Sequence, residues 1–178
     1  MHPSLSFKHC PSCGTPRTPT LEKAIRCSRC DYLFYLNPAL SAAGLILNQR
    51  GEMLFIVRGK APSAGKLALV GGFVDFEETP EQALSREIVE EVGASIEEIN
   101  YFAAFPNPYQ YGGIVYPVID LFFTARLHPT SAASIKDQAE VAALEWMNPM
   151  DVDSDSLAFP SMRQVLSKWQ QSKRHPFS

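Results

Sequence analysis

Apolar residues along this chain fall into short runs of strand length, with two stretches of helical spacing among them. The runs are rich in Val, Ile, Leu, Phe and Ala, and Gly, Pro, Asn or charged residues separate them, which predicts strands joined by turns. The strands are expected at residues 42–47, 53–57, 67–70, 99–104, 116–125 and 141–147, with a hairpin turn at 48–52. A helix is expected at residues 161–172. This mixture predicts an α/β fold in which helices cover both faces of a sheet.

The second helix, at residues 80–92, is the most clearly specified element. Thr79 and Gln82 have the spacing of a capping box, Pro80 suits the first helical position, and Gly93 suits a helix end. Its apolar stripe consists of Leu84, Ile88 and Val92. Both ends of this helix, and therefore its register, are predicted.

An acidic face lies beside that stripe. Glu87, Glu90 and Glu91 are spaced i, i+3 and i+4, so their carboxylates converge. Repulsion between them would destabilise the helix unless a divalent cation bound there, and oxygen ligands favour Mg²⁺ or Mn²⁺. Arg86 can orient a carboxylate but cannot neutralise all three. The alternative is a solvated surface, which is the usual role of a Glu-rich helix face.

Composition and charge narrow the class of protein. With 46% hydrophobic and 20% charged residues, and a mean hydropathy of −0.09, the chain is expected to fold as one soluble domain with a small appendage. No apolar run is long enough for a membrane span, and residues 1–7 do not resemble a secretory signal, so a cytoplasmic protein is expected. The net charge of −3 disfavours tight, sequence-independent binding of nucleic acid by the chain as a whole.

Charge and cysteine are unevenly distributed, which predicts a domain boundary. Residues 1–36 carry a net charge of +3, whereas the remainder carries −6. The cysteines all lie in the basic segment, at Cys10, Cys13, Cys27 and Cys30. We therefore expect a small domain at residues 1–37 and a larger one at residues 38–178.

The two Cys-x-x-Cys pairs predict a structural zinc site. Four thiolates complete a tetrahedral shell around one ion, and so short a segment needs metal ligation for stability because its own core is small. Two disulfides or a redox pair are the alternatives, and a cytoplasmic location argues against disulfides. The cations of this ribbon allow contact with nucleic acid, although a few exposed cations are more often solvated.

The segment around the acidic helix resembles the Nudix box at every fixed position. Read in order, it is Gly72-x5-Glu78-x7-Arg86-Glu87-Ile88-x-Glu90-Glu91-x-Gly93-Ala94. The resemblance implies an α/β/α sandwich with a mixed sheet over most of residues 38–178. It also implies hydrolysis of a pyrophosphate bond in a nucleoside diphosphate linked to another group, with Mg²⁺ or Mn²⁺ as cofactor.

The resemblance assigns roles to the residues of the box. Glu87, Glu90 and Glu91 correspond to metal ligands, and the carbonyl group of Gly72 is a further candidate ligand. Arg86 and Glu78 correspond to supporting residues, with Arg86 counted in the catalytic set.

A general base is expected among the carboxylates, because no histidine lies near the box in the sequence. The histidines are His2, His9, His128 and His175. Glu140 resembles the later glutamate that many Nudix enzymes place opposite the box helix. An exposed charge at a strand edge is the alternative role for Glu140.

A four-cysteine ribbon ahead of a Nudix domain is similar to the NADH pyrophosphatase branch, in which the ribbon is structural. The Ser-Gln-Pro-Trp signature of that branch is not found at the corresponding residues, 105–113. Branches that act on ADP-ribose or on dinucleoside polyphosphates place a proline or a tyrosine at this distance. Pro106, Pro108, Tyr109 and Tyr111 all fall there, so the substrate stays open.

Residues 105–113 are expected to form a loop that binds the base of the substrate. Tyr109 and Tyr111 offer rings for stacking, and the neighbouring glycines permit close approach of the backbone. Arg58, at the end of a strand, can bind a phosphate bidentately. The alternatives are ordinary loop packing and a solvated cation.

Three functions are compatible with these patterns. The leading hypothesis is a metal-dependent pyrophosphohydrolase acting on ADP-ribose, NADH or a related dinucleotide, with a small nucleotide as its partner. The second is a nucleotide-sensing regulator whose ribbon contacts nucleic acid. The third is sanitation of oxidised nucleoside triphosphates. The resemblance also allows a homodimer.

Overall fold

The computed structural model describes residues 1–174 and divides the chain into two compact units. One unit comprises Met1–Ala39 with Pro108–Val118, and the other comprises Leu40–Asn107 with Ile119–Ser178. The elements in chain order are η1 (Pro3–Ser6), β1 (Ala24–Arg26), β2 (Leu33–Tyr35), β3 (Ala39–Leu47), β4 (Met53–Arg58), β5 (Leu67–Ala68), β6 (Val70–Phe73), α1 (Pro80–Val92), β7 (Ile96–Tyr111), β8 (Ile114–Leu127), β9 (Val141–Met147), η2 (Ser154–Ser156) and α2 (Pro160–Arg174). Among these residues no helix has the length and apolar character needed to cross a lipid bilayer. His175 lies outside the described residues.

The smaller unit holds the cysteines and has a very small apolar core. Strands β1 and β2 pair antiparallel, with Ile25 opposite Phe34. Arg17 ties the loops together by donating to the Phe7 carbonyl at 2.8 Å and pairing with Glu22 at 2.8 Å. The buried apolar side chains described in this unit are Cys10, Ile25, Cys27 and Val118. So few apolar contacts provide little of the free energy needed to fold such a segment.

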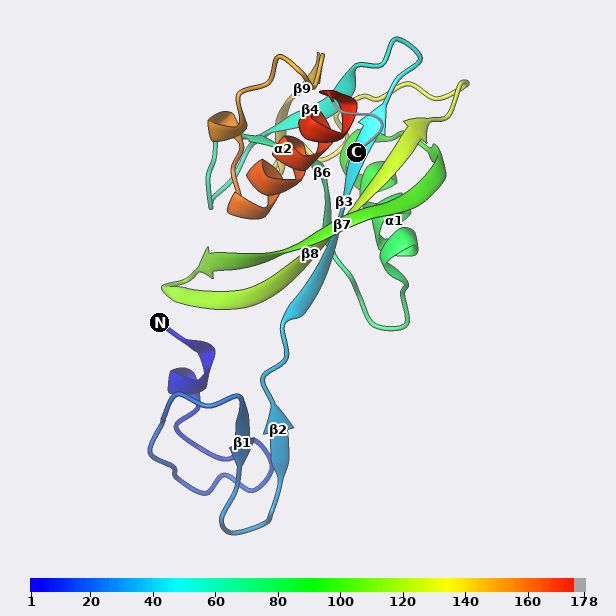
Figure 1. Cartoon of the computed structure of the whole chain (residues 1–178). Coiled ribbons are helices and arrows are strands. Elements are labelled where there is room, and N and C mark those ends of the chain that lie inside the picture. Colours follow the sequence, from blue (N-terminus) through cyan, green and yellow to red (C-terminus); the bar gives the residue numbers. More distant parts are fainter. Residues whose placement is uncertain (175–178) are drawn as a thin grey trace. The chain divides into compact units, whose positions relative to one another are not determined.

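The larger unit is built on a curled, mixed sheet, visible in Figure 1. The strands β5-β4-β3-β8-β7 are neighbours in that order, β6 pairs with β3, and β9 pairs with β4. In the β3–β6 pair, Ala43 lies opposite Gly71 and Ala42 opposite Gly72. This pairing attaches the segment that precedes α1 to the middle of the sheet.

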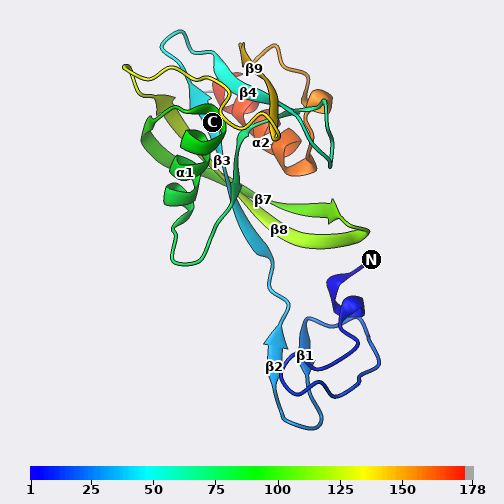
Figure 2. The same cartoon turned by 180° about the vertical axis from the view of Figure 1, so that it is seen from behind.

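The two helices cover opposite faces of this sheet, as Figures 1 and 2 show from two sides. A side chain added at Gly44 of β3 would contact Leu84 of α1 at 3.2 Å. Ser41 of the same strand lies three residues away and therefore on the other face. It donates to Asp120 of β8, which also accepts from Ser161 in the first turn of α2. The predicted α/β/α sandwich is confirmed.

Most predicted elements are found in the structure. Helix α1 and strand β9 have the predicted bounds, and α2 is only slightly longer than predicted. The turn at residues 48–52 is a hairpin turn, in which the Asn48 N–H donates to the Glu52 carbonyl at 3.0 Å. Core side chains come from both helices and from the sheet, and they include Phe55, Phe122, Phe123, Leu45, Ile46, Met53, Leu54, Leu84, Ile88 and Trp169.

The strand predicted at residues 67–70 is wrong in one respect, because two short strands replace it. Strand β5 pairs with β4, whereas β6 pairs with β3. Leu69 lies between them and is 2% exposed. A continuous apolar run therefore changes its partner strand within one residue, which hydrophobic periodicity alone does not reveal.

The loop predicted at residues 105–113 is also wrong. Strand β7 continues to Tyr111, and the turn consists of Gly112 and Gly113, whose φ angles are +57° and +78°. Two successive positive φ values match the tight turns that join hairpin strands. Pro106 and Pro108 lie within β7, which is the last strand in the order, and an edge strand tolerates proline.

Candidate active site and metal centre

Helix α1 carries the box glutamates, and both of its ends are fixed by hydrogen bonds. The Thr79 Oγ1 accepts from the Gln82 N–H at 3.3 Å, and the Gln82 Oε1 accepts from the Thr79 N–H at 2.8 Å. Gly93 closes the helix with φ of +60° and donates to the carbonyls of Ile88 and Val89. The predicted capping box and stop are confirmed, and they set the direction of each glutamate.

Arg86 binds two of the box glutamates and the loop before the helix. Its guanidinium donates to Glu78 at 2.9 and 3.1 Å, to Glu87 at 2.8 Å and to Glu90 at 3.0 Å. A further bond of 3.0 Å reaches the carbonyl of Phe73 at the end of β6. These bonds lower the pKa of Glu78 and raise that of Arg86. Arg86 thus orients the carboxylates, as the sequence predicted.

Glu87 lies directly against the backbone of β6, which requires glycine there. A Cβ atom at Gly72 would lie 2.2 Å from the Glu87 Oε1. At Gly71, where φ is +146°, a Cβ atom would lie 2.1 Å from the Ala42 carbonyl oxygen. The two glycines therefore allow β6 to approach both β3 and the carboxylate, and Gly72 and Glu87 are brought together.

Glu91 is the buried carboxylate of the site, with 6% of its surface exposed. Burial, and next the negative charge of Glu87, raise its pKa to about 8, while the Gly71 N–H opposes this rise. Its Oε2 atom is buried and has no hydrogen-bond partner. A buried carboxylate oxygen without a partner is costly unless another group completes its environment.

The pKa of Glu91 predicts how stability depends on pH when no Mg²⁺ or Mn²⁺ is present. Between the ordinary pKa of 4.5 and about 8, the folded protein keeps a proton that the unfolded chain releases, so stability falls as pH rises. Across this window we expect wild type to lose about 2–4 kcal/mol more than Glu91→Gln. Urea denaturation of both proteins at several pH values measures this difference. Equal pH dependence would contradict the assignment.

Glu140 lies immediately before β9 and joins the site from a different part of the chain. Its charge raises the pKa values of both Glu87 and Glu91, so it lies within electrostatic range of the box. Its carboxylate pairs with Lys60, and its carbonyl accepts from the Gly59 N–H at 2.7 Å. The structure thus brings Glu140 within electrostatic range of Glu87 and Glu91. Its catalytic role stays a prediction.

The residues present fit a hard divalent cation. The unpartnered oxygen of Glu91 is an available ligand atom, and Glu87 and Glu90 lie on the same helix. Burial is the main reason that the pKa of Glu87 is raised, and the negative charges of Glu90 and Glu140 add to this rise. Arg86 binds both Glu87 and Glu90. Among residues 1–174, the only group of three or more ligand residues with atoms within 4.8 Å of one another is that of the cysteines.

Of the other predicted binding residues, Arg58 contacts residues outside the box. The Arg58 Nε donates to the Pro62 carbonyl at 2.8 Å, and the guanidinium lies 5.0 Å from the centre of the Phe159 ring. Its charge still acts on Glu91, whose pKa it lowers. Tyr109 and Tyr111 are on β7 within the unit that holds the cysteines. The binding roles of these residues stay predictions.

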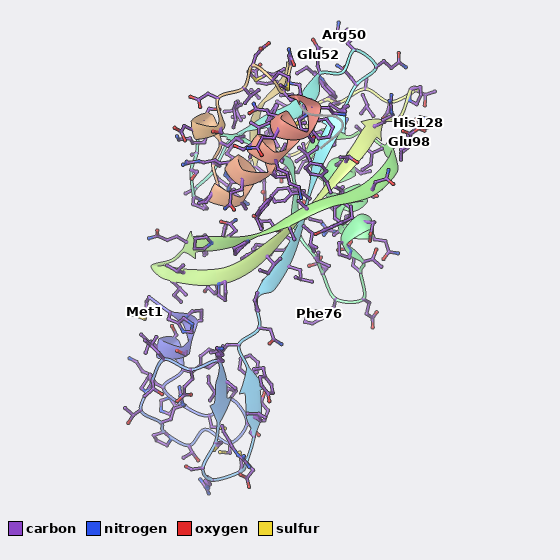
Figure 3. All side chains as sticks on the ribbon, in the orientation of Figure 1. Met1, Arg50, Glu52, Phe76, Glu98 and His128 are labelled. Carbon is purple, nitrogen blue, oxygen red and sulfur yellow. The ribbon has the colours of Figure 1, made fainter. Side chains whose placement is uncertain are left out.

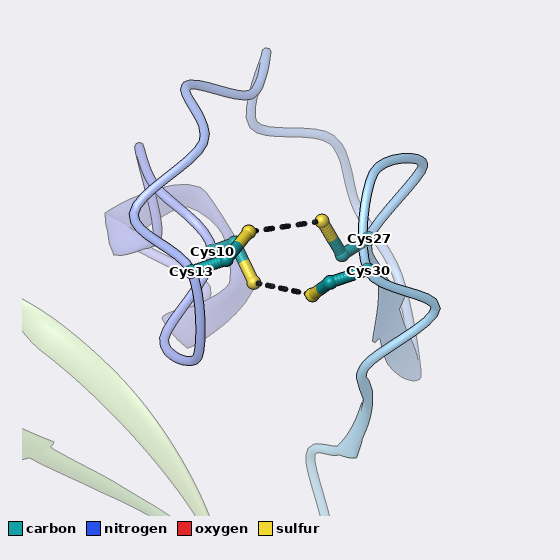
Figure 4. Close-up of side chains that lie close together, drawn as sticks. All are labelled: Cys10, Cys13, Cys27 and Cys30. Atoms are coloured by element: carbon teal, nitrogen blue, oxygen red, sulfur yellow. Dashed lines mark hydrogen bonds between the residues drawn. The ribbon is translucent and has the colours of Figure 1, made fainter.

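The four cysteines have the arrangement expected of a zinc site. The Sγ atoms of Cys10 and Cys30 are 3.8 Å apart, those of Cys13 and Cys27 are 3.7 Å apart, and all four lie within 4.8 Å of one another (Figure 4). Tetrahedral coordination with Zn–S bonds of about 2.3 Å places sulfur atoms about 3.8 Å apart. A hydrogen bond from Thr15 lowers the pKa of Cys13 to about 6, which favours the thiolate. All four cysteines are free, and they fit Zn²⁺.

Sequence reasoning missed three features of the larger unit. Lys60 pairs with Glu140, a contact between residues 80 positions apart that no local pattern reveals. Asp120 is 5% exposed and bridges Ser41 and Ser161, and it looked like an interruption in an apolar run. Phe76, in the box loop, is fully exposed (Figure 3).

The fold and the box together define a Nudix domain. A family model described as the NUDIX domain matches residues 37–169, and the chain belongs to this family. It is 34% identical over 115 residues to the NAD-capped RNA hydrolase NudC of Haemophilus influenzae, a match covering 60% of this chain and 43% of that protein. The protein of the same name from Deinococcus radiodurans is 28% identical over 166 residues, covering 90% of this chain and 56% of the relative. The chain therefore spans about half the length of these curated relatives.

A solved structure matches nearly the whole chain. The NUDIX hydrolase from Nitrosomonas europaea is 25% identical, with a TM-score of 0.69, and the match covers 95% of this chain and 93% of that protein. The likeness thus includes most of the cysteine-containing segment as well as the Nudix domain.

Proposed function

We propose that this protein is a pyrophosphohydrolase that cleaves a nucleoside diphosphate linked to another group, with Mg²⁺ or Mn²⁺ as cofactor. The observation that carries this proposal is the unpartnered, buried oxygen of Glu91 on the same helix as Glu87 and Glu90. A protein that only bound a nucleotide would gain nothing from burying a carboxyl oxygen that has no hydrogen-bond partner. A cation that both the carboxylates and a pyrophosphate contact would explain it.

The residues of the site divide the work between them. Glu87, Glu90 and Glu91 would hold the cation, with the Gly72 carbonyl as a further ligand. When bound, such a cation withdraws charge from the phosphoryl oxygens and provides an activated water molecule. Arg86 keeps two of these carboxylates oriented through its hydrogen bonds.

The proton of the attacking water is taken by a carboxylate in this proposal. Glu140 is the candidate outside the box, because its charge acts on both Glu87 and Glu91. Its carboxylate pairs with Lys60, which fixes its direction. Arg58 is the candidate to bind a phosphate of the substrate, in exchange for its contact with the Pro62 carbonyl.

The substrate class follows from the relatives and from the chemistry of the site. The two curated relatives are named as hydrolases of NAD-capped RNA, so their substrate contains a dinucleotide pyrophosphate. We propose ADP-ribose, NADH or a related dinucleotide for this chain, with Tyr109 and Tyr111 as candidates for base stacking. We further propose that residues 1–37 form a structural zinc ribbon and residues 38–178 the hydrolase domain.

A hydrolysis screen tests the proposed function. NADH, NAD, ADP-ribose, FAD, dinucleoside polyphosphates and nucleoside triphosphates are each incubated with the protein and Mg²⁺ or Mn²⁺, and the products are identified by mass. Two mononucleotides from a dinucleotide, or AMP and a sugar phosphate from ADP-ribose, support the proposal. Release of inorganic pyrophosphate from triphosphates alone identifies the sanitation activity instead. Nucleotide binding without any hydrolysis favours the regulator.

A further inference from the structure

A cationic groove lies on the larger unit between helix α2 and edge strand β7. Its volume is about 340 Å³, and it is lined by Phe105, Arg163, Gln164, Ser167, Lys168 and Gln171. Since α2 covers the face of the sheet opposite α1, this groove does not belong to the box. Two cations, three uncharged polar side chains and one aromatic ring line it, and none of these residues is acidic.

The charge of this groove contrasts with that of its surroundings. Helix α2 contains four cationic residues and no acidic one, whereas the rest of residues 37–178 carries a net charge of −10. Among the ion pairs found in residues 1–174, none involves Arg163 or Lys168. Lys168 is exposed and Arg163 is half-buried, and two cations without an ion-pair partner on one helix attract an anionic ligand.

Aromatic rings lie beside these cations. The Lys168 Nζ lies 5.4 Å from the centre of the Phe102 ring, and Phe105 packs against Phe122 with ring centres 6.3 Å apart. The Arg163 Nε donates to the Leu157 carbonyl at 3.1 Å, which fixes the direction of its guanidinium. Phe105 is only half-buried, so part of its ring is open to a ligand.

These features match the chemistry of single-stranded nucleic acid. Such strands are bound by cations that follow the backbone and by aromatic rings on which bases stack. Residues 163–171 rise about 12 Å along the helix axis, which exceeds the length that one mononucleotide phosphate would occupy. Glutamine and serine side chains offer donors and acceptors to base edges.

We propose that the groove between α2 and β7 binds a short single-stranded segment of nucleic acid. Arg163 and Lys168 contact phosphates, and a base stacks against Phe105. This binding goes beyond the proposed hydrolysis and does not depend on it, because no residue of the box takes part.

A matched pair of charge reversals tests this proposal. Lys168 and Lys173 are on the same helix and each lies over an aromatic ring, but only Lys168 lines the groove. A fluorescent oligouridylate of about 12 nucleotides, without any pyrophosphate, is titrated with the full chain by anisotropy at about 50 and about 200 mM salt. We expect Lys168→Glu to weaken binding by about tenfold and Lys173→Glu by about twofold or less. Circular dichroism verifies that both variants are folded.

Three results would overturn the proposal. In the first, wild type does not bind the oligonucleotide even at the lower salt concentration. In the second, the two variants weaken binding equally, which would indicate an unspecific response to net charge. In the third, AMP competes as well as the strand does per mole, which would indicate a mononucleotide site. The titration measures binding alone. Its result can therefore be interpreted even if the nucleotide screen finds no hydrolysis.

Discussion

Replacement of Glu91 by glutamine is expected to lower kcat for pyrophosphate hydrolysis by about 10³-fold or more, with the fold retained. The change removes a charge from a carboxylate that has a buried oxygen without a partner, and hydrolysis depends on cations that such charges hold. A loss of about 4 kcal/mol of transition-state stabilisation corresponds to this factor. Initial rates on the best substrate of the screen, over a range of Mn²⁺ concentrations, measure it.

Two further variants show whether the loss is specific. Glu90→Gln should have a similar effect on rate, although Glu90 has a side chain that is 58% exposed and contributes little to packing. Glu81→Gln is the matched control, because Glu81 is an exposed acidic residue in the first turn of the same helix. It should keep wild-type activity. If Glu91→Gln and Glu90→Gln both hydrolyse the substrate at wild-type rates, the proposed role of the box is wrong.

Replacement of Cys27 by serine is expected to release zinc and unfold the small unit. The apparent free energy of binding Zn²⁺ to a structural four-ligand site is about 10–16 kcal/mol, far more than the few buried apolar side chains there contribute. Metal analysis should find about one zinc per wild-type chain and much less in the variant. Hydrogen exchange should lose its protection at residues 24–35 and retain it in α1.

Ser28→Ala provides the control for this variant, because Ser28 lies within the same Cys-x-x-Cys turn and is not a proposed ligand. It should retain both zinc and protection. Wild-type protein that contains no zinc, with four reactive thiols and full protection, would show that the cluster needs no metal.

Local sequence signals allowed a correct prediction wherever one physical effect dominated. Thr79, Gln82 and Gly93 specify the ends of α1 independently of the rest of the fold, so that its bounds were correctly predicted. Gly112 and Gly113 form a tight turn at the end of β7 and not part of a long loop, and the edge position of β7, which allows prolines in the strand, was unknown from the sequence. Whether a strand lies at the edge depends on the order of all strands in the sheet, and the sequence of one short segment does not reveal that order.

The sequence predicted which side chains are candidate metal ligands, but it did not predict how buried they are. The spacing of the glutamates indicated a shared face, but it did not show that Glu91 is buried or that Gly72 of β6 lies against Glu87. The net charge of the whole chain disfavoured nucleic acid as a partner. This total does not show that the cations of α2 are separated from the acidic residues in the rest of its unit. Such separation is seen only when charges are assigned to elements.

The bridge formed by Asp120 limits how the second helix can move. Its carboxylate accepts from Ser41 of β3 and from Ser161 at the start of α2, and it is almost entirely shielded from water. Sliding the helix along the sheet by even one turn would break both hydrogen bonds and leave a buried carboxyl group without partners, at a cost of a few kcal/mol. We therefore expect any rearrangement that accompanies ligand binding to occur in the connecting segments, with α2 and the sheet moving as one rigid body.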